Sequence, residues 1–348
     1  MGRNAAPALA LAGVLMLAVA VCAPASAGST GSIAPSPTDP FYQPPSGYAS
    51  TAPGTILRSR PVLLAAFGVL PEPVRAWQLL YRSTDWQGDP MATVTTVLLP
   101  TGGTPKGLLS YQIAEDASAA RCAPSHALLL GGDLGEVVNQ AELVAIDAAV
   151  AQGFAVSVPD YEGPDSEWGA ARQPGYAILD GLRAAQRFAP LGLPGPATPT
   201  GLWGYSGGSL ALLATAGSQC EVANLAGHAL INMSDYLTVS FNDFLALPAV
   251  TAAFDQLDLG GTTPTAPIYV YHAVHDELVP IAGADATVRD YCAHGDSVSY
   301  VRHEVGEHAS VMLTGMPAAL DWLTNRLAGG PAPVGCTTTT AIAAPAPK

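Results

Sequence analysis

Gly204-Tyr205-Ser206-Gly207-Gly208 is the stretch that decides the fold, because it fits the pattern Gly-x-Ser-x-Gly. A short strand is predicted before it, at residues 201–203, and a helix after it, at residues 209–216. In this context the pattern presents a nucleophilic hydroxyl on a sharp, strained turn, and small residues two positions away on each side allow close backbone packing. The following helix directs its first amides at the reacting oxygen, where negative charge develops. The stretch therefore predicts Ser206 as a nucleophile.

A serine hydroxyl needs a base, and the base needs an acid that orients it. On this type of turn the three residues follow the chain order Ser, acid, His. Asp276 comes just after a strand predicted at residues 268–272, and His308 comes just after one predicted at residues 298–303. We therefore predict a catalytic triad of Ser206, Asp276 and His308.

Neighbouring residues leave alternatives for two of these roles. Other carboxylates could be the acid: Glu277, Glu304 and Asp296. Other histidines could be the base: His303 and His294. The donors of His272, His275 and Asp276 could also bind a metal, but no third cluster of ligands is evident, so neither metal nor cofactor is expected.

Two backbone amides are expected to bind the oxyanion of such a site. One belongs to Gly207, directly after the nucleophile, and the other is expected in the loop after an early strand. The strand predicted at residues 108–112 is the best candidate, and its loop covers residues 113–117. Spacing alone does not select one residue in that loop.

Strands and helices alternate from residue 108 onward, which predicts an α/β fold with a mostly parallel sheet covered by helices on both faces. Beyond those already given, a strand is expected at residues 154–158. Helices are expected at residues 136–151, 176–188, 281–291 and 309–327. Residues 77–82 and 93–99 are expected to pair as an antiparallel edge.

Composition limits the classes of partner. The chain has 348 residues, of which 49% are hydrophobic and 12% charged, and its formal net charge is −14. Such acidity argues against nucleic acid as a partner, because phosphate binding depends on Lys and Arg. The apolar fraction is ample for a folded core. The sequence also gives no sign of a stable protein partner.

The N-terminus has the features of a secretory signal peptide. A positive start at Arg3 precedes an apolar run at residues 8–21 and the small residues Ala25-Ser26-Ala27. We therefore expect cleavage after Ala27 and a secreted protein; Cys22 allows a lipoprotein as the alternative. A Pro-rich arm is expected at residues 28–56, a main domain at 57–327 and a flexible tail at 328–348.

Cysteines after the signal peptide are even in number, as is usual in an exported chain with disulfides. They are Cys122, Cys220, Cys292 and Cys336. A bridge to Cys336 would tether the loose tail, which favours the pairs Cys292–Cys336 and Cys122–Cys220. The other pairings, and free buried thiols, stay open.

Several longer stretches resemble the secretory lipases of the Candida antarctica lipase A type, over about residues 39–327. They are Asp39-Pro-Phe-Tyr42, Tyr81-Arg-Ser-Thr-Asp85, Ser110-Tyr-Gln112 with Glu115-Asp116, Cys122-Ala-Pro-Ser125, Val158-Pro-Asp-Tyr-Glu-Gly163, Gly175-Tyr-Ala-Ile-Leu-Asp-Gly-Leu-Arg183 and the serine turn. The resemblance implies an α/β-hydrolase fold and hydrolysis of carboxylic esters, including triacylglycerols. It also implies that Asp116 supplies the second oxyanion amide, and it matches Ser206, Asp276 and His308 to the family's triad.

One departure from that family concerns the helical cap between nucleophile and acid. Here only 70 positions separate Ser206 from Asp276, so a shortened cap is expected at about residues 221–264. A smaller cap puts long-chain specificity and activation at a lipid–water interface in question and favours an open site for short acyl esters. The expected substrate is a lipid or a small ester. An acyltransferase on the same triad, or an inactive lipid-binding protein, is the alternative function.

Overall fold

The computed structural model describes residues 38–117, 119–132, 137–168, 170, 172–209, 240, 242–243, 246–248, 251, 264 and 266–342. Contacts divide the chain into two units, residues 1–32 and 33–348, and every described residue belongs to the second. The signal peptide expected at 1–27 lies outside the described residues, as does nearly all of the cap expected at about 221–264.

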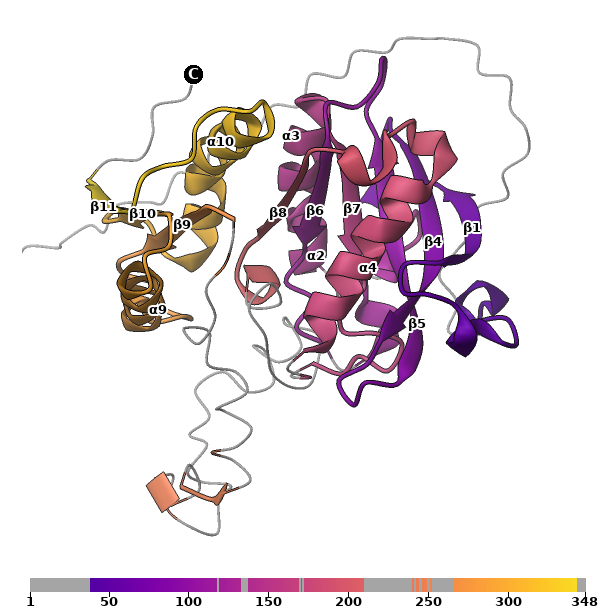
Figure 1. Ribbon diagram of the computed structural model, residues 1–348, viewed down its shortest axis with the longest axis horizontal. Coiled ribbons are helices and arrows are strands. Elements are labelled where there is room, and N and C mark those ends of the chain that lie inside the picture. Colours follow the sequence, from indigo (N-terminus) through magenta and orange to yellow (C-terminus); the bar gives the residue numbers. More distant parts are fainter. Residues whose placement is uncertain are drawn as a thin grey trace, which may run out of the picture. The chain divides into compact units, whose positions relative to one another are not determined.

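A six-stranded mixed sheet has the strand order β1-β4-β5-β7-β6-β8 (Figure 1). Its strands are β1 (Ile56–Val62), β4 (Arg75–Thr84), β5 (Pro90–Leu99), β6 (Leu108–Gln112), β7 (Ala155–Pro159) and β8 (Thr200–Gly204). The pairs β1/β4, β4/β5 and β5/β7 are antiparallel, whereas β7/β6 and β6/β8 are parallel. The parallel part places the ends of β6 and β8, and the loops that follow them, next to each other.

The predicted hairpin of β4 and β5 is present, but it is not the edge of the sheet. β1 pairs with β4 and takes that position. Pro61 lies inside β1, and a proline without an amide hydrogen is tolerated in an edge strand. The weak alternation of apolar residues around this proline explains why the sequence did not predict β1.

Helices pack on both faces of the six-stranded sheet. Leu182 of α4 (Gln173–Arg187) shares a buried cluster with residues of β4 and β5. Ile146 of α3 (Leu143–Ala151) and Leu320 of α10 (His308–Leu327) share a different one with residues of β6 and β7. The helix expected at residues 136–151 is two helices, because α2 (Val137–Ala141) ends one residue before Glu142, which separates it from α3.

A second sheet is parallel throughout, with the order β11-β10-β9. It consists of β9 (Ile268–Ala273), β10 (Val298–His303) and β11 (Cys336–Ala341), and α9 (Ile281–Ala293) connects β9 to β10 (Figure 1). Within the tail expected at residues 328–348, residues 336–341 form strand β11. These residues add a strand to β10, and the Cys292–Cys336 disulfide joins that strand to α9.

The Cys292–Cys336 pairing confirms one of the two expected disulfides, with a Cα–Cα distance of 5.7 Å. Cys122 is also disulfide-bonded, but the expected pairing with Cys220 lies outside the described residues.

The remaining described elements are short. They are the 3-10 helices Pro40–Tyr42, Tyr48–Ser50, Ala120–Cys122, Ala189–Leu191 and Gly195–Ala197, the helix α1 (Pro124–Ala127), and the paired strands β2 (Ala65–Ala66) and β3 (Leu70–Pro71). Phe41 fixes the described part of the N-terminal arm, because it is buried against Leu80 and Val94 of the main sheet. In the part of the chain that the structure describes, no helix is both long enough and apolar enough to cross a bilayer.

Candidate active site

The turn after β8 holds Ser206 in the left-handed region, with φ of 49°. A residue with a side chain adopts this conformation at an energetic cost, so the surrounding contacts must maintain it. The flanking glycines make those contacts possible. A Cβ on Gly204 would come within 2.7 Å of the backbone of Gly208, and a Cβ on Gly208 would collide with the carbonyl of Gln112. The serine turn therefore has the tight geometry that its sequence predicts.

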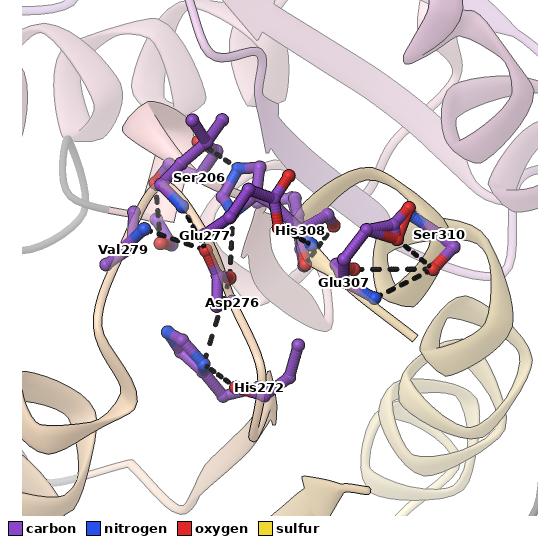
Figure 2. Close-up of polar contacts among 12 residues, drawn as sticks. Ser206, His272, Asp276, Glu277, Val279, Glu307, His308 and Ser310 are labelled. Carbon is purple, nitrogen blue, oxygen red and sulfur yellow. Dashed lines mark hydrogen bonds and ion pairs between the residues drawn. The ribbon is translucent and has the colours of Figure 1, made fainter. Parts of the chain in front are cut away.

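Ser206, His308 and Asp276 form a continuous chain of hydrogen bonds (Figure 2). The Nε2 atom of His308 lies 2.8 Å from Oγ of Ser206, and its Nδ1 atom lies 2.8 Å from Oδ2 of Asp276. His308 is buried, being 8% exposed. An Nδ1–H that donates to the carboxylate leaves Nε2 as the acceptor for the serine hydroxyl, which is the arrangement that general-base activation requires.

Asp276 is held by the turn in which it lies. Its Oδ1 atom accepts hydrogen bonds from the amides of Leu278, at 3.0 Å, and Val279, at 2.7 Å. Burial acts to raise the pKa of this carboxyl, but the hydrogen bonds from Val279 and His308 outweigh it and keep the pKa below its usual value. Asp276 is therefore an anion at neutral pH, with its second oxygen directed at the imidazole.

The backbone of His308 is held from two sides. Its amide donates to Oε2 of Glu277 at 3.0 Å, and its carbonyl accepts from the hydroxyl of Tyr205 at 2.8 Å. Glu277, an alternative for the acid, thus contacts the histidine backbone, whereas Asp276 contacts the ring. Residues next to the nucleophile and next to the acid together fix the position of the histidine.

Among the described residues, no histidine other than His308 forms a hydrogen bond with Ser206. His303 lies within β10, is 5% exposed, and packs edge-on against Tyr271; burial lowers its pKa. His294 caps the C-terminus of α9. His272 lies 3.9 Å from the Asp276 carboxylate through Nδ1, which also lies 2.9 Å from the carbonyl of Ala273. Among the described residues, no three His, Cys, Asp or Glu side chains gather as a possible metal site.

The loop that follows β6 brings Asp116 to the serine turn. Asp116 has φ of 35°, and its carboxyl lies so close to Gly207 that a Cβ there would collide with it. The carboxyl accepts a hydrogen bond from Nε1 of Trp168 at 2.8 Å, and burial raises its pKa. Only a glycine at position 207 allows this contact, so the structure brings both predicted oxyanion residues together.

Comparisons with known proteins show the family to which this chain belongs. The family model described as secretory lipase matches residues 129–233 and 218–335. A protein of Mycobacterium tuberculosis (strain CDC 1551 / Oshkosh) named probable inactive lipase is 39% identical, over 84% of this chain and 82% of its own length. Lipase A of Arthroderma benhamiae is 34% identical, over 88% of this chain and 82% of its own length. This chain belongs to the secretory lipase family.

The fold of this secretory lipase family member is the α/β-hydrolase fold. The solved structure of Candida antarctica lipase A superimposes with a TM-score of 0.73 at 24% identity, and the match covers 89% of this chain and 90% of that one. The family resemblance and the α/β-hydrolase fold predicted from the sequence are both confirmed, and the six-stranded sheet is mixed, with three antiparallel pairs and two parallel ones.

Sequence reasoning missed the side chains around the loop of Asp116. Buried acceptors hold three amides of that loop, and they come from outside it: Glu142, Tyr161 and Glu162. Two of them, Tyr161 and Glu162, lie in the stretch 158–163 that carries the family resemblance, which was the available signal. Glu142 lies in the middle of the helix predicted at residues 136–151 and gives no signal of its own in the sequence.

Proposed function

We propose that this chain is a secreted serine hydrolase that cleaves carboxylic esters of lipids or small alcohols. The single observation that supports the proposal best is the relay from Asp276 through His308 to Ser206, with both imidazole nitrogens 2.8 Å from their partners. Membership of the secretory lipase family agrees with this reaction class. The site needs no metal or cofactor for such chemistry.

Each residue has a defined role in the proposed reaction. Ser206 Oγ attacks the ester carbonyl while His308 Nε2 takes its proton, and the carbonyl oxygen becomes an oxyanion. The amides of Asp116 and Gly207 stabilise that oxyanion. His308 then gives the proton to the leaving alkoxide, and the alcohol departs. Water, activated by the same imidazole, hydrolyses the acyl-enzyme and releases the carboxylic acid and the serine hydroxyl.

The alternative predicted from the sequence is an inactive lipid-binding protein, and the M. tuberculosis relative is named probable inactive lipase. The geometry of this chain argues against that alternative. A protein without turnover has no use for a strained serine at φ of 49° whose hydroxyl lies 2.8 Å from an imidazole paired with a carboxylate. An acyltransferase would use the same residues, with an alcohol in place of water in the second step.

A fluorophosphonate probe tests the activated serine, and p-nitrophenyl esters test turnover. We expect the parent protein to be labelled and active, and Ser206→Ala to lose both. His308→Ala should also abolish turnover, whereas His303→Ala should keep it. Absence of labelling in the folded parent would refute the proposal and favour the binding protein. Hydrolysis by His308→Ala at the parental rate would refute the assignment of the base.

Secretion is part of the proposal, supported by the charge and apolar pattern of residues 1–27. Expression in a host that exports proteins should yield a culture-supernatant form whose first residue is Gly28. Retention of the full leader in an extracellular product would contradict cleavage after Ala27. Hydrolysis rates for esters of increasing acyl length, in monomeric and emulsified form, would then define the substrate class.

A further inference from the structure

The loop of residues 113–117 is fastened by its amides to buried side chains of other segments. The amide of Ala114 donates to Oε1 of Glu142 at 2.9 Å. The amide of Glu115 donates to the hydroxyl of Tyr161 at 3.1 Å, and that of Ala117 donates to Oε2 of Glu162 at 3.3 Å. The three acceptor residues are at most 2% exposed, so water does not compete for these bonds.

Asp116 lies in the middle of these tethered amides and is the exception. Its own amide donates to no acceptor among the residues that the structure describes, although the amides on both sides have partners. Its φ of 35° is strained, and such a conformation persists only where the surroundings impose it. The neighbouring tethers are the contacts in place to do so, and the strained residue between them has no acceptor for its amide among the described residues.

Tyr161 makes two of the contacts to this loop. Its hydroxyl accepts from the amide of Glu115 and donates to the carbonyl of Ile113 at 2.8 Å. Tyr161 follows the end of β7, which pairs in parallel with β6, the strand that leads into the loop. The hydroxyl therefore closes a bridge between the loops at the carboxyl ends of two neighbouring strands.

We infer that Tyr161, supported by Glu142 and Glu162, is a positioning residue that aims the amide of Asp116 at the oxyanion. This inference rests on the proposed function, because it assigns Asp116 the second donor. Loss of a donor outright typically costs ~100- to 1000-fold in kcat. A donor that is present but no longer held at its position should cost less.

Tyr161→Phe tests the inference, because it removes the hydroxyl and keeps the ring. We expect kcat to fall at least ~10-fold with KM little changed, which is the pattern of an interaction made only in the transition state. Tyr81→Phe is the matched control. Tyr81 is 0% exposed, and its hydroxyl donates to the carbonyl of Ala177 in α4 at 2.8 Å rather than to the oxyanion loop. This variant should lose comparable thermal stability but keep the parental kcat.

Tyr111→Phe extends the test if Tyr161→Phe folds poorly. The hydroxyl of Tyr111 donates to Oε2 of Glu142 at 2.7 Å. Removing it should free the Glu142 carboxylate and so weaken the hydrogen bond that Glu142 accepts from the amide of Ala114. We expect a smaller fall in kcat, again without a change in KM.

Equal kcat in Tyr161→Phe and Tyr81→Phe would overturn the inference, as would a change confined to KM. The two proposals fail differently. If the folded parent neither reacts with a fluorophosphonate nor hydrolyses esters, the proposed function is refuted together with the role of Tyr161. An active parent whose turnover is insensitive to Tyr161→Phe refutes the positioning role alone.

Discussion

Replacing Asp276 with Asn should nearly abolish turnover, because of the hydrogen bonds that the carboxylate accepts from its own turn. In the parent, Oδ1 accepts from the amides of Leu278 and Val279, while Oδ2 faces Nδ1 of His308 at 2.8 Å. An asparagine has one oxygen for these two places. If its NH₂ group faced the two amides, donors would oppose donors and two hydrogen bonds would be lost.

The oxygen of the introduced asparagine should therefore stay with the two backbone amides, because each unmet polar group costs ~1–3 kcal/mol. The NH₂ group then donates to Nδ1 of His308, which moves the imidazole proton to Nε2. Protonated Nε2 does not accept the proton of Ser206. A wrong tautomer of this kind lowers kcat by ~10⁴-fold, or ~5.5 kcal/mol of transition-state stabilisation.

The assay is the kcat and KM of p-nitrophenyl butyrate hydrolysis for Asp276→Asn, with melting temperatures to confirm folding. Glu277→Gln is the matched control, because its remaining oxygen can still accept from the amide of His308. This control should lose less than ~10-fold, since a neutral acceptor replaces a charged one. A kcat for Asp276→Asn within tenfold of the parent would refute the reasoning. A larger loss of kcat in Glu277→Gln than in Asp276→Asn would assign the acid to Glu277 instead.

Two further predictions concern the oxyanion loop. Gly207→Ala should lower kcat by ~100-fold or more, because its Cβ would collide with the Asp116 carboxyl and displace the Asp116 amide from the oxyanion. Gly175→Ala in α4, where a Cβ meets nothing within 4 Å, should keep parental kinetics. Glu162→Gln should flatten the fall in stability as the pH rises from about 5 to 9. Burial and the nearby Asp116 raise the pKa of Glu162 from 4.5 to about 9, so the folded chain keeps a proton that the unfolded chain releases, and stability falls as pH rises between these values. Denaturation at pH 5 to 9 measures the slope, up to ~1.4 kcal/mol per pH unit for one such proton; an unchanged slope in Glu162→Gln would contradict the prediction.

The three residues of the relay were predictable because they obey a rule of chain order and strand ends. Ser206, Asp276 and His308 each follow a strand whose apolar pattern is visible in the sequence, and the structure brings these three together. The rivals could not be dismissed in advance. Whether Glu277 meets the ring or the backbone of His308 depends on one turn of a loop.

Strand β11 was not predicted, because its sequence shows no apolar alternation. β11 is Cys-Thr-Thr-Thr-Thr-Ala, and its residues are mostly exposed, so no apolar alternation marks it. Thr suits a strand, but its side chains gain little when they stay in water. The pairing with β10 and the disulfide to Cys292 fix it instead, and both are contacts between distant parts of the chain.

The tethers of the oxyanion loop were hidden because their burial is a tertiary property. A Glu in a sequence reads as a surface residue, yet Glu115 and Glu162 are each 1% exposed beside a third buried acid, Asp160. Burial first, and repulsion from neighbouring carboxyls as well, raise the pKa of both Glu115 and Glu162. Only the folded arrangement shows that these acids lie beside the site.

Such acids are compatible with catalysis only in their protonated form. The proposed reaction develops negative charge beside the amides of Asp116 and Gly207, and an ionised carboxylate close by would oppose that charge. With a pKa of about 9, Glu162 is neutral at neutral pH, and its Oε2 atom still accepts the amide of Ala117. The burial of Glu162 therefore lowers stability as the pH rises, and it also keeps this carboxyl uncharged near the oxyanion. The upper pH limit of activity should accordingly follow the proton of Glu162.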